Sequence, residues 1–196
     1  CDSYEYEGVD TPESFSWIPK AVTSVKNQGQ CGSCWSFSAA GSMEGAWAIN
    51  SGDLVDLSEQ QLIDCSKSYG NLACKGGEMD SAFQYAIDNG MCLDSAVPYE
   101  AVNEACGNMP ECDTVATFSG CVDVTSMNEI HLKEAVFQQP VAVAIEADTT
   151  VFQFYKSGVI DSTSCGTNLD HGVLTVGWGV ENDIPYWLVK NSWGAD

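Results

Sequence analysis

QGQCGSCW, residues 28–35, is more informative than any other stretch of this 196-residue chain. Two cysteines stand three positions apart, behind a polar loop that contains glycine, and apolar residues follow them. These residues predict a buried helix that opens at Ser33 and closes near Gly52. Cys34 would then lie in the first helical turn, where the positive end of the helix dipole favours a thiolate. A thiolate is a far better nucleophile than a thiol, so the pattern predicts nucleophilic catalysis by Cys34.

Two cysteines at this spacing have two other uses, a zinc site and a redox dithiol. The chain has two histidines, His131 and His171, and no second such cysteine pair, so a zinc site lacks ligands. A dithiol is expected directly after a strand, whereas a polar loop precedes Cys31. This disfavours a Cys31–Cys34 dithiol oxidoreductase but leaves it as an alternative.

A cysteine nucleophile needs a base beside it. His131 lies in a charged helical stretch, and we interpret it as a solvated surface residue. His171 lies at the start of an apolar strand and follows Cys34 by about 140 positions, within the roughly 130–150 typical of this pair. We therefore predict His171 as the base.

The base and the reaction intermediate need further support. Asn191, at the end of another predicted strand, would orient the imidazole, and Trp193 would shield their hydrogen bond from water. The side-chain amide of Gln28 and the backbone N–H of Cys34 would stabilise the oxyanion that forms on the attacked carbonyl. No metal or cofactor is implied.

Charge and composition limit the choice of partners and compartment. The chain carries 28 Asp and Glu against 7 Lys and Arg, a net charge of −21, which disfavours nucleic acid and anionic membranes. No apolar run is long enough to cross a bilayer, and no leader peptide is recognisable. Ten cysteines indicate an oxidising compartment, and the acidic surface suggests an acidic one. We expect a lysosomal, vacuolar or secreted protein.

The chain changes character near residue 122. The first part is rich in predicted helices, one beginning at Ser58 with a capping box to Gln61 and running through Ile63, and another carrying Met79, Phe83, Ala86 and Ile87 on one face. The second part has predicted strands at residues 141–145, 172–180 and 186–190, and one helix capped by Ser126 and Glu129. We predict an α+β fold with a mainly helical lobe (residues 11–122), a mainly β lobe (residues 123–196) and a site between them.

Several stretches resemble the papain family of cysteine proteases, and cathepsin L in particular. The C-G-S-C-W motif at residues 31–35 is a papain-type signature. Further stretches with this resemblance are residues 21–23, 57–60, 64–65, 74–77, 98–100, 170–172 and 191–194. The resemblance covers about residues 11–194. It implies a helical left lobe and a β-barrel-like right lobe, with the active-site cleft between them.

The resemblance implies a cysteine endopeptidase that acts through an acyl-thioenzyme and favours a bulky hydrophobic P2 side chain. Protein and peptide substrates would bind to Gly76, Gly77, Glu78, Met79, Ala144, Leu169, Asp170, Gly172 and Trp193. Glu78 departs from the usual apolar residue; it either admits basic P2 residues or points to solvent, which we favour. The resemblance also implies a monomer inhibited by its own propeptide and by cystatin-like proteins. The alternative in this family is an inactive binding or storage protein.

The resemblance also sorts the cysteines. It pairs Cys31 with Cys74 and Cys65 with Cys106, leaves Cys34 free, and gives Cys165 a partner only beyond Asp196. We therefore expect the β lobe to lack its C-terminal strands. A bridge between Cys112 and Cys121 is a further hypothesis, Cys1 and Cys92 have no counterpart, and residues 1–10 are interpreted as a propeptide remnant or N-terminal extension.

Overall fold

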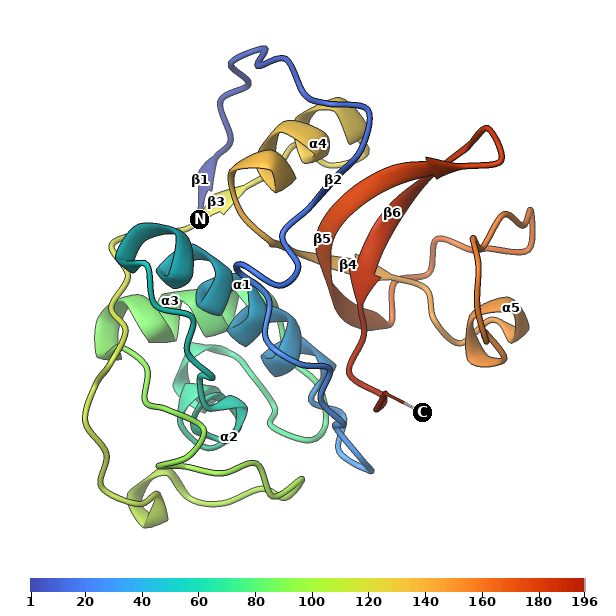
Figure 1. The fold of residues 1–196 in the computed structure, drawn as a ribbon. Coiled ribbons are helices and arrows are strands. Elements are labelled where there is room, and N and C mark those ends of the chain that lie inside the picture. Colours follow the sequence, from blue (N-terminus) through green and yellow to red (C-terminus); the bar gives the residue numbers. More distant parts are fainter. Residues whose placement is uncertain (196) are drawn as a thin grey trace.

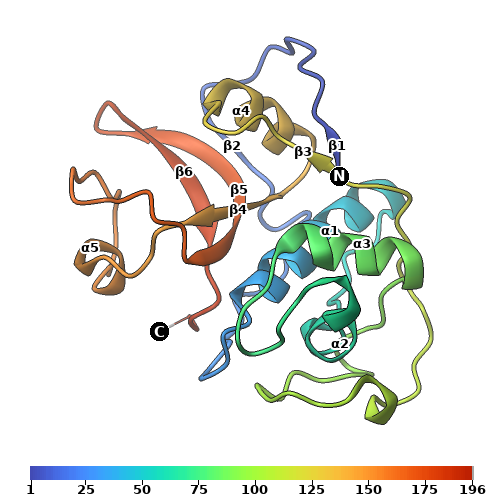
Figure 2. The ribbon, with the colours of Figure 1, turned by 180° about the vertical axis from the view of Figure 1, so that it is seen from behind.

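The computed structural model describes residues 1–195. A helical part, whose main helices lie within residues 34–89, and a sheet part, whose strands lie at residues 15–16 and within 141–190, are side by side (Figures 1 and 2). The α-helices are α1 (Cys34–Ser51), α2 (Glu59–Cys65), α3 (Met79–Asn89), α4 (Glu129–Gln138) and α5 (Thr150–Gln153). The 3-10 helices are Ser66–Tyr69 and Cys106–Asn108. The strands are β1 (Asp2–Ser3), β2 (Phe15–Ser16), β3 (Val122–Asp123), β4 (Val141–Ile145), β5 (His171–Glu181) and β6 (Ile184–Lys190). No helix within residues 1–195 has the length and apolar character needed to span a membrane.

Helix α1 is central because it is buried on nearly every side, as its apolar sequence predicts. Trp35, Ala39 and Met43 belong to the core of the helical part, together with α2 and α3. On its other side, glycines let the sheet part come close: a Cβ at Gly41 would lie 2.8 Å from the Leu174 side chain of β5. Helix α1, which begins at Cys34, therefore forms the wall between the two parts.

The other helices of the first part follow the predicted pattern, with one difference. Ser58 caps α2 by accepting a hydrogen bond from the Gln61 backbone N–H at 3.0 Å. The Gln61 side chain does not complete the capping box; it donates to the Tyr85 hydroxyl and the Gly90 carbonyl. It thereby ties α2 to α3, and α2 continues to Cys65, two residues beyond the predicted end.

The sheet part is built around the long strand β5. It pairs antiparallel with β6 along one edge and with both β4 and β2 along the other, giving four strands. Strands β4, β5 and β6 cover the three predicted strand segments. The predicted combination of a helical lobe and a β lobe is confirmed, and within residues 1–195 the sheet of the β lobe is curved but does not close into a barrel (Figure 1).

Helix α4 differs from its prediction in how it begins. The N-cap is Asn128, whose side chain accepts from the His131 N–H at 3.1 Å, so the predicted cap at Ser126 is wrong. His131 is also not simply a solvated residue: it is half-buried, and its ring stacks on Tyr6 at 4.8 Å. A segment far away in the sequence covers it, which the local charge pattern could not reveal.

That covering segment is residues 1–9, here called the N-terminal strap. Cys1 is bonded to Cys121, and β1 pairs in parallel with β3. The carboxylate of Glu134, which is 2% exposed, accepts hydrogen bonds from the Tyr4 hydroxyl (2.8 Å) and from the backbone N–H groups of Glu7 and Val9 (both 2.7 Å). The strap is thus fastened covalently at one end and by α4 along its length.

Four disulfides form within the described residues. Cys31–Cys74 and Cys65–Cys106 are the pairs that the resemblance implied. The hypothesis of a Cys112–Cys121 bridge is wrong, since the other two bonds are Cys1–Cys121 and Cys92–Cys112. An isolated β-bridge, formed by backbone pairing of Met91 with Ala116, brings Cys112 toward Cys92. Cys121 lies next to β3, which pairs with β1, and is therefore beside Cys1. Cys34 and Cys165 are free.

Candidate active site

Cys34 is the first residue of α1, so its backbone N–H has no partner within the helix and the dipole's positive end lies beneath its side chain. Burial by itself would raise the pKa of the Cys34 thiol. Hydrogen bonds from His171 and from the backbone of Gly172 and Trp35, together with the charge of His171, outweigh burial and lower this pKa. The site therefore favours a thiolate.

The predicted base faces Cys34 from the sheet part. His171 begins β5 and Asn191 directly follows β6, so pairing of these two strands brings the residues together. The imidazole Nε2 lies 2.7 Å from the Asn191 Oδ1. Burial lowers the pKa of His171, but the hydrogen bonds to Cys34 and Asn191 and the charges of Cys34 and Asp170 raise it by more. A protonated imidazole is thus favoured beside the thiolate.

The tautomer of His171 follows from a second contact. The Ser192 backbone N–H donates to the same Asn191 atom at 2.8 Å, so that atom must be the amide oxygen. An oxygen without hydrogen can only accept, and His171 Nε2 therefore carries a proton. This leaves Nδ1 to exchange its proton with Cys34.

Aromatic rings cover the His171 side of the site. The Trp193 ring lies 4.8 Å from the His171 ring, as expected for a residue that shields the histidine–asparagine bond. Phe152 of α5 lies 5.5 Å from Trp193 and 6.4 Å from His171. Sequence reasoning missed Phe152, because α5 has only four residues and carries no motif that marks it.

Gln28 is held at several points in the loop before α1. Its backbone N–H donates to the Ser192 carbonyl at 2.8 Å, and its Oε1 accepts from the Ser192 hydroxyl at 2.7 Å. Its Nε2 donates one hydrogen to the Cys31 carbonyl at 3.1 Å and has a second one to give. Gln28 is buried, so this amide is an ordered donor on the Cys34 side of the site.

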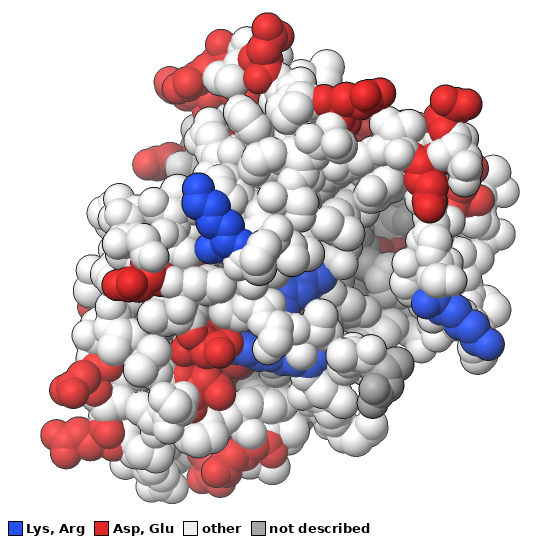
Figure 3. Space-filling model, viewed as in Figure 1, with Lys and Arg blue, Asp and Glu red and all other residues white. Residues whose placement is uncertain are grey.

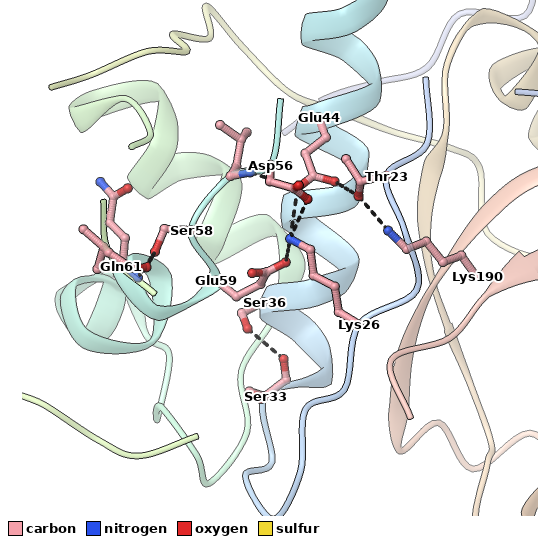
Figure 4. Close-up of polar contacts among 12 residues, drawn as sticks. Thr23, Lys26, Ser33, Ser36, Glu44, Asp56, Ser58, Glu59, Gln61 and Lys190 are labelled. Atoms are coloured by element: carbon pink, nitrogen blue, oxygen red, sulfur yellow. Dashed lines mark hydrogen bonds and ion pairs between the residues drawn. The ribbon is translucent and has the colours of Figure 1, made fainter. Parts of the chain in front are cut away.

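A buried charge cluster lies between the two parts, and the sequence analysis missed it (Figure 4). Lys26 Nζ contacts Glu59 at 2.7 Å and Glu44 at 3.4 Å, and both carboxylates are almost fully buried. The Thr23 hydroxyl donates to Glu44 and accepts from Lys190 of β6, which joins the cluster to the sheet. The available signal was Glu44, the one charged residue in the middle of α1.

Burial and neighbouring charges compete in setting the pKa values of this cluster: burial dominates at Glu59, whereas the carboxylates outweigh burial and raise the pKa of Lys26. The pKa of Glu59 is raised to about 7, because burial and the charge of Glu44 together raise it by more than Lys26 lowers it. One Glu59 oxygen, Oε2, has no hydrogen-bond partner. A cavity of about 10 Å³, near the minimum for one water, adjoins Glu59, Lys190 and Asn191.

The structure brings together only some residues predicted for the substrate cleft. Ala144 pairs with Gly172 across β4 and β5, and a Cβ at Gly172 would lie 3.2 Å from the Met79 sulfur and 3.4 Å from the Cys34 carbonyl. Gly77 packs so tightly against Trp35 that a Cβ there would lie 2.7 Å from its ring. Leu169 is 64% exposed and Glu78 is exposed.

Asp170 accepts the backbone N–H groups of Ala147 and Asp148, so it fixes the turn after β4 as well as flanking His171. The surrounding surface is acidic. Figure 3 shows carboxylates spread around the edge of one face, consistent with the net charge of −21.

Comparisons with known proteins agree with this geometry. The model of the papain family of cysteine proteases matches residues 11–196. The cysteine proteinase RD21A of Arabidopsis thaliana is 49% identical over 98% of this chain and 42% of its own length. A cathepsin L-like peptidase of Aedes aegypti is 50% identical over 97% of this chain and 58% of its own length.

A solved structure also matches. The digestive procathepsin L 3 of Tenebrio molitor larval midgut has a TM-score of 0.91 and 48% identity, and covers 98% of this chain and 63% of that one. The chain spans about half the length of the Arabidopsis thaliana and Aedes aegypti relatives.

Proposed function

The chain belongs to the papain family of cysteine proteases, and we propose that it is an endopeptidase in which Cys34 attacks the scissile carbonyl. The observation that carries the proposal is the arrangement around His171. Its Nε2 is bound to the Asn191 oxygen at 2.7 Å, and interaction with His171 lowers the pKa of the free Cys34 thiol. A free thiol with a lowered pKa beside an oriented imidazole is the arrangement that a cysteine nucleophile needs.

The first half of the reaction forms a thioester. The Cys34 thiolate adds to the carbonyl carbon, and the Gln28 amide and the Cys34 backbone N–H stabilise the resulting oxyanion. The oxyanion then collapses, the C–N bond breaks, and the His171 imidazolium gives its proton to the leaving amine.

The second half restores the enzyme. Neutral His171 takes a proton from water, the resulting hydroxide adds to the thioester carbonyl, and the acid product leaves as the C–S bond breaks. The proton stays on His171, so the thiolate–imidazolium pair is ready again. Asn191 keeps the imidazole in the required tautomer throughout.

We also propose a preference for a bulky hydrophobic P2 side chain, since Met79, Ala144 and Gly172 lie together beside Cys34. Glu78 is exposed and would contribute little to this pocket. Protein substrates, an inhibitory propeptide, cystatin-like inhibitors, a monomeric state and a lysosomal, vacuolar or secreted location complete the proposal. The bond between Cys31 and Cys74 argues against a Cys31–Cys34 dithiol oxidoreductase.

The test uses a fluorogenic peptide with Leu or Phe at P2 and a matched pair of variants. Cys34→Ala should abolish cleavage, whereas Cys165→Ala, which removes the other free thiol, should leave it unchanged. A peptide with Asp at P2 should be cleaved much more slowly. Equal cleavage by wild type and Cys34→Ala would refute the proposed function.

A further inference from the structure

The backbone carbonyl of Gln28 has a partner that the reaction scheme above does not use. The hydroxyl of Tyr99 lies 2.6 Å from this oxygen and 2.7 Å from the Ser33 hydroxyl. Ser33 directly precedes the nucleophile, and Gln28 supplies the oxyanion donor. Tyr99 therefore contacts two segments of the site although it lies about 65 residues away in the sequence.

The direction of these hydrogen bonds can be assigned. The Gln28 carbonyl can only accept, so the Tyr99 hydroxyl must donate its single proton there. With that proton used, the Ser33 hydroxyl is the donor in its 2.7 Å contact with the Tyr99 oxygen, which is shorter than its 3.3 Å contact with the Cys31 carbonyl. Burial raises the pKa of Tyr99 by more than the hydrogen bond with Ser33 lowers it, which keeps the phenol protonated and able to donate. The result is a chain from Ser33 through Tyr99 to Gln28, in which each bond polarises the next.

Ser33 would ordinarily have a different role. It is the N-cap residue of α1, where a serine hydroxyl usually accepts a backbone N–H from the first helical turn. No such bond forms here, and the hydroxyl of this fully buried side chain lies against Tyr99 instead. The helix thus begins without its usual cap, and the capping group is used to hold Tyr99.

Tyr99 is itself firmly positioned. Its ring packs edge-to-face on Phe37 of α1, with 4.8 Å between centroids. The chain before and after Tyr99 is bound to α2 and its cap. The Glu100 N–H donates to the Gln60 side chain at 3.0 Å, and the carbonyl of Val97, two residues before Tyr99, accepts from Ser58 at 2.7 Å. Because these anchors belong to the helical core, the Tyr99 hydroxyl is a fixed point for the Gln28 loop.

We propose that Tyr99 is a positioning residue that holds Gln28 so that its free side-chain N–H points at the developing oxyanion. The inference deepens the proposed function and rests on it. Gln28 is held at its N–H by Ser192 from the sheet part and at its C=O by Tyr99 from the helical part. If the contact between Tyr99 and the Gln28 C=O is lost, the Gln28 side-chain amide is held less firmly. Since the oxyanion exists only during the reaction, the loss falls on kcat rather than on KM.

The test compares two deletions of a tyrosine hydroxyl. Tyr99→Phe keeps the ring against Phe37 and should lower kcat/KM by about three- to tenfold, the range expected for one hydrogen bond, through kcat. Tyr85→Phe is the matched control, because its hydroxyl bonds Gln61 between α2 and α3 and touches no catalytic group. It should leave kcat unchanged. An unchanged kcat in Tyr99→Phe would overturn the proposal.

Two further measurements exclude a general structural effect. Alkylation of Cys34 by iodoacetamide forms no oxyanion, so its rate and pH profile should be the same in Tyr99→Phe and wild type. In a Gln28→Ala background, Tyr99→Phe should have no further effect on kcat. Slower alkylation, or the same fold-loss in both backgrounds, would show that Tyr99 does not act through Gln28.

Failure of the proposed endopeptidase function can be distinguished from failure of the proposed role of Tyr99. If wild type has no peptidase activity that depends on Cys34, the endopeptidase proposal fails. Hydrogen–deuterium exchange then still tests the contact: amides at residues 27–33 should exchange faster in Tyr99→Phe than in Tyr85→Phe. Equal exchange in the two variants would refute the role of Tyr99 in holding this loop.

Discussion

The two sides of the active site are held by different means. On the Cys34 side, a disulfide from Cys31 to Cys74 and a buried helix fix the position of Cys34 within the helical part. On the His171 side, His171 is the first residue of β5, and no disulfide joins residues within 122–195. Its position relative to Cys34 depends on contacts between the parts, such as Ser192 with Gln28 and Lys190 with Thr23.

This difference teaches that Cys34, the proposed nucleophile, is placed by local structure and His171, the proposed base, by long-range packing. The Cys34 side should therefore tolerate disturbance of the interface, whereas alignment of His171 should not. The four predictions that follow separate the two sides, beginning with the largest expected effect.

Removing the base tests the His171 side directly. His171→Ala should lower kcat/KM by roughly 10²- to 10⁴-fold, since it removes the general acid and base. His131→Ala, which removes the other histidine of the chain, should leave kcat/KM unchanged. Steady-state kinetics on one fluorogenic peptide measure both. Comparable losses in the two variants would contradict the assignment of the base.

Breaking the interface cluster should destabilise the fold strongly. Lys26→Met leaves the buried Glu44 and Glu59 without their cation, and we expect a loss of about 3–5 kcal/mol in the free energy of unfolding. Lys67→Met removes an exposed lysine and is the control. Urea denaturation followed by tryptophan fluorescence measures the difference. A loss no greater than that of the control would mean that the cluster does not hold the parts together.

Disulfide removal should distinguish the strap from the nucleophile loop. Replacing Cys1 and Cys121 by serine frees the N-terminal strap and should cost about 2–4 kcal/mol, as should replacing Cys31 and Cys74. Only the second change should also lower kcat/KM, because it loosens the loop that carries Gln28. Thermal denaturation and kinetics on the two double variants test this. Loss of activity on releasing the strap would contradict it.

The pH dependence of activity should report on Cys34 in its acid limb and on His171 in its alkaline limb. Activity should fall at low pH as Cys34 is protonated at its lowered pKa, and at high pH as His171 loses its proton at its raised pKa. Asn191→Ala removes a hydrogen bond that raises the pKa of His171, so it should move only the alkaline limb, toward lower pH. Profiles of kcat/KM for both proteins measure this. A shifted acid limb with an unchanged alkaline one would oppose it.

Local patterns predicted most of the helices and strands, and the structure brings Cys34, His171 and Asn191 together as the site prediction requires. The helix from Cys34 and the strand from His171 follow from apolar periodicity, and their end positions place Cys34 and His171 opposite each other. What the sequence did not reveal depends on distant segments. His131 is covered by the N-terminal strap. Cys112 forms its disulfide with Cys92 because backbone pairing of Met91 with Ala116 brings their segments together. Lys26 contacts Glu59 only in the folded chain.

The central claim is that Cys34 is a thiolate because His171 stands beside it, and alkylation tests this most directly. Iodoacetate at pH 5 should modify Cys34 much faster than Cys165, the other free thiol, as read by peptide mass spectrometry. His171→Ala should remove this preference. Equal modification of the two cysteines in wild type, or a preference that survives His171→Ala, would contradict the account.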